Sequence, residues 1–141
     1  MQFYEYSGLI NDEKWSDENE DRRVLSARIR KISRESKNFN KQFCGDAFFF
    51  VADACDDTVL IGIICNEPID VQAKAEEYIK ALNLDVRDTS LEETTFNSIC
   101  SMLGTACRCD YIDDDDAILE DFNLDTLYSE RKACIKTIDA G

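Results

Sequence analysis

Carboxylates are the most abundant side chains in this sequence that could do chemistry, and the densest group is the run Asp113–Asp116. Mg²⁺ and Ca²⁺ prefer hard oxygen ligands of this kind. The pattern of a calcium-binding EF-hand loop fails, because the fifth position counted from Asp114 is Ile118 and no glycine occupies the sixth. Aspartates also stabilise the first turn of a helix through its macrodipole. We therefore interpret the run as a solvated helix start and predict no metal there.

A second acidic group surrounds one predicted hairpin, with Asp46 at its far end and Asp53, Asp56 and Asp57 near its tip. A metal-dependent nuclease would need a lysine or another base at a defined place beside such a cluster, and no such signature is present. Aspartate is common in tight turns for conformational reasons alone. The sequence therefore predicts neither a catalytic metal nor any other cofactor.

Histidine is absent, which removes Ser-His-Asp and Cys-His catalysis and the usual zinc sites that contain histidine. The seven cysteines include no CxxC pair, and the closest two are Cys107 and Cys109. We expect the cysteines to be reduced, small buried side chains. No phosphate-binding or dinucleotide-binding glycine motif occurs, and the five glycines are far apart. These features point away from the common enzyme classes, and we predict a non-catalytic protein.

Positive charge is concentrated between Arg22 and Lys41, in a chain whose net charge is −14. Such a segment can contact the phosphates of a nucleic acid or the acidic groups of a protein. The overall negative charge repels a polyanion at long range, so acidic protein surfaces, including the remainder of this chain, are the favoured partners. Aromatic residues near the N-terminus could anchor an interface or pack an edge strand onto the core. The candidate interaction residues are Tyr4, Tyr6, Trp15, Arg22, Arg23, Arg28, Arg30, Lys31 and Arg34.

The elements that must position these residues begin with a short strand within Met1–Ile10 and a helix that starts after Ser16. Acidic residues in the early turns of this helix and basic residues in its later turns match the helix macrodipole. Alternation of apolar and polar residues leaves a strand over residues 22–34 as the open alternative.

The clearest strands are Asp46–Ala54 and Thr58–Cys65. Only the short polar segment Cys55-Asp56-Asp57 separates them, so we expect an antiparallel hairpin. Both strands are almost continuously apolar, which predicts interior strands that are covered over much of both faces of a sheet.

A second helix is predicted over Ile69–Leu82, with Pro68 at its first position and Asn83 as its stop. The alternating segment Leu84–Thr89 predicts another strand. The next four residues, Ser90-Leu91-Glu92-Glu93, have the spacing of a capping box.

After this capping box we expect a helix that ends at Gly104 and buries Phe96, Ile99, Cys100 and Leu103. Two further helices are predicted within residues 117–122 and 124–138.

Residues 1–89 thus follow the order strand, helix, strand, strand, helix, strand. This order predicts an α+β fold, a ferredoxin-like βαββαβ sandwich with a four-stranded antiparallel sheet and two helices on one face. Residues 90–141 form a helical extension of two or three C-terminal helices that could cover the other face. We expect a single α+β domain over residues 1–141. It could be the N-terminal domain of a longer protein or a complete small protein, and both alternatives stay open.

The combined features predict a non-catalytic protein-interaction or accessory domain of a larger bacterial or phage-type cytosolic protein, with a protein as its partner. A nucleic-acid-binding module that uses residues 22–41 and an acidic inhibitor that mimics nucleic acid are the alternatives. No apolar stretch approaches the roughly 20 residues of a membrane span. The N-terminus also lacks the basic and apolar regions of a secretory signal, so we expect a cytoplasmic chain without a membrane partner. Formation of a homo-oligomer stays open.

Overall fold

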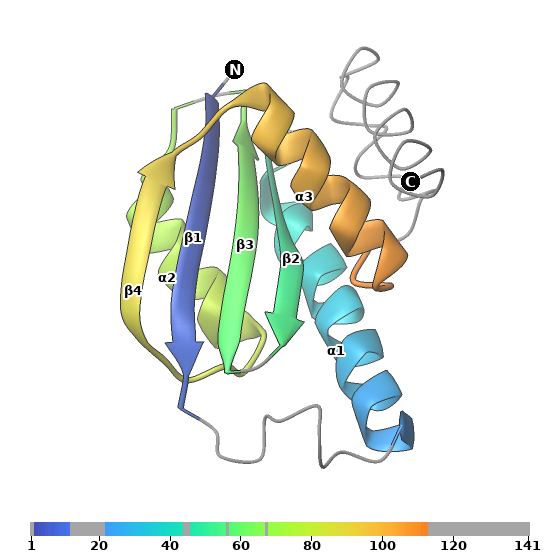
Figure 1. Cartoon of the computed structure of the whole chain (residues 1–141). Helices are drawn as coiled ribbons and strands as arrows, with labels where there is room; N and C mark the ends of the chain where they lie inside the picture. The colour runs from blue at the N-terminus through green and yellow to red at the C-terminus, as the bar shows by residue number, and fades with distance from the viewer. Residues whose placement is uncertain (1, 12–21, 44–45, 56, 67, 113–141) are drawn as a thin grey trace.

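A four-stranded antiparallel sheet with helices on both faces forms the core of the molecule (Figure 1). The computed structural model describes residues 2–11, 22–43, 46–55, 57–66 and 68–112. The order of the strands in the sheet is β2-β3-β1-β4, and each neighbouring pair is antiparallel. In chain order the elements are β1 (Gln2–Ile10), α1 (Arg22–Asn40), the 3₁₀ helix η1 (Lys41–Phe43), β2 (Ala47–Cys55), β3 (Thr58–Cys65), α2 (Val71–Ala81), β4 (Val86–Glu93) and α3 (Phe96–Arg108).

The α+β class predicted from the sequence is confirmed, and residues 22–34 belong to a helix and not to a strand. The predicted cap at Ser16 and the two predicted helices after residue 116 lie outside the described residues.

The predicted hairpin is confirmed: β2 and β3 pair with Phe48 opposite Ile64, and the left-handed residue Asp57 (φ 68°) stands at its tip. β3 lies inside the sheet as expected, but β2 is an edge strand of the described sheet. Residues 47–52 are nevertheless at most 1% exposed. The apolar sequence of β2 therefore reflects cover by helices on its two faces and along its outer edge, and not a central place in the sheet.

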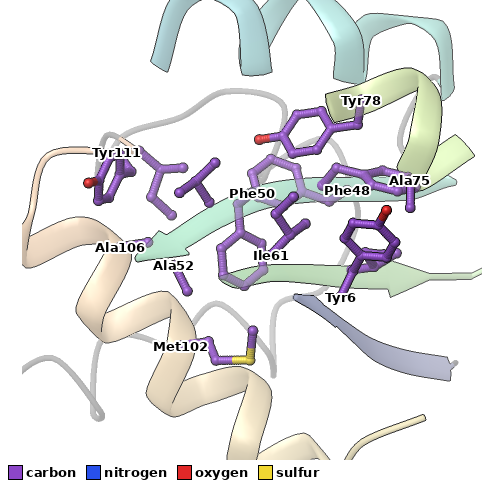
Figure 2. Close-up of a cluster of buried hydrophobic side chains, with 14 of the residues drawn as sticks. Tyr6, Phe48, Phe50, Ala52, Ile61, Ala75, Tyr78, Met102, Ala106 and Tyr111 are labelled. Atoms are coloured by element: carbon purple, nitrogen blue, oxygen red, sulfur yellow. The ribbon is translucent and has the colours of Figure 1, made fainter. Parts of the chain in front are cut away.

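Successive residues of β2 point to opposite faces of the sheet, and each face has its own helical cover. On one face, the ring of Phe49 packs against Phe39 of α1 and Tyr78 of α2, with centroid distances of 5.3 and 5.6 Å. On the other face, α3 crosses the sheet (Figure 1). Figure 2 shows the two sides, with Tyr78 beyond one face and Met102 of α3 beyond the other.

The predicted start of α2, at Pro68 or Ile69, is two to three residues too early. The Asp70 carboxylate accepts a hydrogen bond from the Ala73 N–H (3.1 Å) and caps the helix, so Val71 is its first residue. Asn83 follows the C-cap residue Leu82 and stops the helix as predicted, in a left-handed conformation with φ 59°.

The boundary between β4 and α3 is also different from the prediction. Ser90 and Leu91 do not start a helix, because they pair with Ser7 and Tyr6 of β1 and extend β4. The cap of α3 is Thr95, whose hydroxyl accepts a hydrogen bond from the Ser98 N–H at 3.2 Å. The predicted division of the chain at residue 89 therefore cuts through a strand.

The helix α3 also continues past the predicted stop at Gly104 and ends at Arg108. Gly104 is itself buried, and the following turn still packs against the sheet through Ala106, which is 0% exposed. Tertiary packing outweighs the low helix propensity of a single glycine here.

Candidate interaction surface on helix α1

Helix α1 has an inner side that is packed into the core. Ile32, Ser36, Phe39 and Asn40 are at most 9% exposed. Their spacing of three or four residues places them on one side of the helix, so the opposite side faces solvent.

The outer side of α1 carries four exposed cations, Arg23, Arg30, Lys31 and Arg34, which we call the basic stripe. At 1.5 Å per residue, the stripe extends over about 16 Å from its first to its last residue. The helix as a whole contains seven basic residues and one acidic residue, in a chain whose net charge is −14. Positive charge is thus strongly segregated onto this one element.

Three cations of the stripe, Arg30, Lys31 and Arg34, are poorly neutralised within the described structure. Arg34 Nε lies 3.6 Å from Glu35 Oε1, and the side chains are 66% and 31% exposed. An exposed pair at this distance contributes little to stability. Arg30 and Lys31 form no ion pair with any residue that the structure describes. Arg30 and Lys31 are consequently available to an external anion.

The other predicted candidates are distributed differently. Arg28 is half-buried on the inner side of α1, so it does not belong to the stripe. Arg22 begins the helix, but its side chain and Trp15 lie outside the described part of the chain. Of the two alternatives for the N-terminal aromatic residues, Tyr6 follows the second, because it is 2% exposed and packs in the core beside Ala75 (Figure 2).

Tyr4 remains partly exposed, and its hydroxyl donates a hydrogen bond to Gln2 Oε1 at 2.9 Å. Partial burial raises the pKa of Tyr4, and the negative charge of Glu93, followed by that of Cys65 once its thiol ionises at alkaline pH, raises it further. Its phenol therefore stays neutral at physiological pH and offers a partner only a hydrogen bond and ring surface.

A buried polar network joins α1 to the outer edge of β2. Asn40 Nδ2 donates a hydrogen bond to the Phe49 carbonyl, and the Phe49 N–H donates to Asn40 Oδ1, both at 2.8 Å. The amide of Asn40 thus replaces the backbone of a further strand at this edge. This role of Asn40 was not predicted from the sequence, although its spacing from Ile32 and Ser36 on the buried side of the helix was a signal.

The hydroxyls of Ser36 and Tyr78 form the second part of this network, with their oxygens 2.5 Å apart. Burial raises the pKa of Tyr78 far above its usual value, while hydrogen bonds to Ser36 and to the Val51 backbone lower it in part. Together with Asn40, these groups fix the inner side of α1 against the sheet. The basic stripe therefore has a defined outward orientation.

On the face of the sheet opposite α1 and α2, the described aromatic residues are covered fully or in part. Phe48 and Phe50 are at most 1% exposed under α3, which also buries Ile99 and Leu103. Phe3 on the same face is partly buried and packs against Phe96 of α3, with ring centroids 5.7 Å apart. Proteins that bind RNA on such a sheet leave these rings open for stacking. Stacking of bases on the central strands would therefore require α3 to leave the sheet.

Within the described ranges, no group of three or more cysteine, aspartate or glutamate side chains is placed to hold a metal ion. The predicted acidic group is spread out: Asp46 precedes β2, whereas Asp53 lies near Cys109 at the far end of the strand. Burial and then the charge of Asp53 raise the pKa of the Cys109 thiol. Asp56 and the run Asp113–Asp116 lie outside the described residues.

No protein-family model matches this chain, and no curated protein or solved structure matches it. Over the described residues, no helix is both long enough and apolar enough to cross a membrane. The interpretation of the basic stripe therefore depends on its own geometry and charge.

Proposed function

We propose that this chain is a non-catalytic binding module whose basic stripe docks onto an acidic surface of a partner protein. The observation that carries the proposal is the exposure of four cations along one side of α1 in a chain of net charge −14. Exposed ion pairs are individually weak. Several cations on one rigid helix nevertheless act together, and they select the face with which a partner docks.

The distribution of acidic residues supports this proposal. Glu76 and Glu77 of α2 and Asp88, Glu92 and Glu93 of β4 are all exposed. In the order of the sheet, β4 lies at the edge opposite β2, which is the strand that α1 covers (Figure 1). An acidic partner is therefore attracted to one side of the molecule and repelled from the other, which accelerates productive encounters.

The proposal also covers the fold of the module, the kind of protein that contains it and its cellular compartment. The element order strand, helix, strand, strand, helix, strand and the sheet order β2-β3-β1-β4 support a ferredoxin-like sandwich with α3 added on its second face. We place the module in a larger bacterial or phage-type protein. The thiols Cys65, Cys100, Cys107 and Cys109 fit a reducing compartment such as the cytosol.

A second candidate function is binding of single-stranded nucleic acid by the same stripe. It is favoured by the three arginines, because guanidinium groups contact phosphates well. It is the weaker candidate, because the sheet face that would stack bases is covered and the rest of the chain repels a polyanion.

The test is fluorescence anisotropy of two labelled probes, a peptide of alternating glutamate and glycine and an oligothymidylate, at low and at physiological salt. We expect the peptide to bind and the double variant R30E/K31E to weaken binding by about tenfold, which corresponds to roughly 1.4 kcal/mol. The matched control is K80E/R108E, which makes the same change of charge at exposed cations on α2 and α3.

Equal loss of binding in both double variants would show an effect of net charge alone and would refute the proposal. Tighter binding of the oligothymidylate than of the peptide, lost in R30E/K31E but kept in K80E/R108E, would establish the nucleic-acid alternative. Circular dichroism of every variant verifies that the fold is retained.

A further inference from the structure

The two edges of the sheet differ in how their backbone groups are satisfied. Asn40 and Tyr78 occupy the outer edge of β2. β4, by contrast, pairs with β1 on its inner side, and no other strand of the described chain lies on its outer side (Figure 1). All residues from Arg87 to Ser90 are exposed. An open edge of this kind is a template for the addition of another strand.

A bulge in β4 determines which backbone groups point outward. Asp88 has φ 52°, and β4 advances by three positions, from Arg87 to Ser90, where β1 advances by two, from Ser7 to Leu9. At one end, the Asn11 N–H donates to the Asp85 carbonyl, and at the other the Thr94 N–H donates to the Phe3 carbonyl, both at 2.8 Å.

Backbone groups in a strand alternate in direction, so the neighbours of these two inward-bonded residues point away from β1. Counting from Asp85 makes Val86 outward, and counting from Thr94 makes Glu93 outward. In a regular strand, residues that point outward are an even number of positions apart. Val86 and Glu93 are seven positions apart, so without the bulge they could not both point outward. The extra residue therefore allows Val86 of one strand to pair with Glu93 of an identical antiparallel strand.

The side chains of β4 carry a second signal. Glu92 lies directly opposite Glu5 of β1, so two carboxylates are cross-strand neighbours on the same face of the sheet. Like charges in this position are destabilising. Arg87, which lies opposite Leu9 on that face, is held only by an exposed contact of 3.5 Å with Asp88. Among the residues with described positions, β4 thus contributes to a pair of acids that no cation compensates, and it carries a weakly held cation.

We propose that β4 is a self-association edge, at which β4 of a second copy pairs antiparallel so that Arg87 of each copy lies opposite Glu92 of the other. In this register Val86 lies opposite Glu93, which matches the outward backbone groups. Arg87 and Glu92 then form a pair without backbone hydrogen bonds, in which Cα atoms are only about 4.5 Å apart. Each arginine also reaches the Glu5–Glu92 pair and relieves its repulsion.

Other registers are less favourable. A shift by one residue places outward groups of one strand opposite inward groups of the other, which breaks the ladder. A shift by two residues in one direction places Asp88 opposite Glu93, and a shift by two in the other direction separates Arg87 from Glu92. The charges and the backbone therefore select the same register.

This inference goes beyond the proposed function and uses the opposite side of the molecule. The basic stripe lies on α1, at the β2 side of the sheet (Figure 1). Pairing through β4 would join two sheets into one continuous eight-stranded sheet and leave a basic stripe at each end. A partner with two acidic sites would then bind with higher avidity than a monomeric module allows.

The test is sedimentation equilibrium of the full chain over a range of concentrations at physiological salt, which screens the repulsion between two acidic copies. We expect a reversible dimer. The single variants R87E and E92R each place like charges opposite one another twice per dimer, and we expect each to raise the dissociation constant by about tenfold. The double variant R87E/E92R exchanges the charges and is expected to restore dimerisation.

The matched control is K80E, which makes the same change of charge as R87E at an exposed position on α2. A monomer at all concentrations up to about 500 μM, a range that still detects weak association, would overturn the inference. Equal weakening by K80E and R87E, or failure of the double variant to recover, would overturn it as well. None of these results bears on peptide binding by R30E/K31E, so the two proposals fail independently.

Discussion

Replacement of Asn40 by alanine tests the central packing feature of this fold, the amide that completes the edge of β2. Asn40 is 1% exposed, and it makes two hydrogen bonds of 2.8 Å to the backbone of Phe49, which is 0% exposed. The variant N40A leaves one buried N–H and one buried carbonyl without these bonds. We therefore expect a large loss of stability from the removal of one small side chain.

The magnitude follows from the number of groups that lose their bonds. Each buried backbone group left unsatisfied costs about 1–3 kcal/mol, and entry of a water molecule into the vacated space recovers part of this. We expect N40A to lower the free energy of unfolding by about 2–4 kcal/mol, a large fraction of the roughly 5–15 kcal/mol typical of a domain. For a chain of this size the midpoint temperature should fall by about 3 °C per kcal/mol, or roughly 6–12 °C.

The assay is urea unfolding followed by circular dichroism, together with a thermal melt. The matched control is N38A, because Asn38 is on the same helix but exposed, and its replacement should change the free energy of unfolding by less than about 0.5 kcal/mol. A loss below about 1 kcal/mol in N40A, or equal losses in both variants, would refute the argument that the amide closes the edge of β2.

Further predictions concern the packing and the titration of the core. A Cβ added at Gly62 would overlap the ring of Phe50, with Cε2 only 2.8 Å away, so G62A should lower the free energy of unfolding, measured in urea, by about 1–3 kcal/mol. The variant G8A should cause a smaller loss, because its Cβ would meet the Thr89 methyl at 3.2 Å. Replacement of the Phe50 ring in F50L should partly rescue G62A. Burial raises the pKa of Tyr78 in the folded state above its unfolded value near 10, so the folded state holds this proton more tightly and stability should fall as pH rises above about 10. The variant Y78F should be less stable than wild type at neutral pH and should show a flatter decline in alkaline melts; an unchanged slope would contradict the assignment. Burial raises the pKa of Cys65 from its usual 9.0 to about 11, so its alkylation by iodoacetamide, followed by mass spectrometry, should remain slow at pH 9; rapid labelling of Cys65 in the folded chain would contradict this expectation.

Much of the local structure follows from patterns within short segments. The Phe48–Val51 and Val59–Ile64 runs, separated by a short polar turn, predict the central hairpin because apolar β-prone residues and turn residues act over a few positions. Helix α1 was less certain, since its apolar residues fit both a helix and a strand. The choice depends on whether Ile32, Ser36, Phe39 and Asn40 meet one surface, and that surface belongs to distant parts of the chain.

The wrong prediction of a helix start within β4 also arises from contacts with distant parts of the chain. Ser90-Leu91-Glu92-Glu93 has the local signature of a helix start, yet it forms ladder pairs with Tyr4–Ser7, which lie more than 80 residues earlier. Capping saves a few hydrogen bonds locally, whereas the ladder satisfies the backbone along the whole segment and extends the sheet. A pattern of four residues contains no information about a partner strand that is remote in the sequence.

The sequence by itself determined the apolar hairpin, the absence of histidine chemistry and the concentration of cations in residues 22–41, because these depend only on residue types and short spacings. Tertiary structure alone decided that Tyr6 is buried, that Arg28 faces inward, that Asn40 closes one edge of the sheet and that no described strand lies beyond β4 at the other edge. Burial and edge pairing arise from contacts between segments far apart in the chain, so no local pattern encodes them.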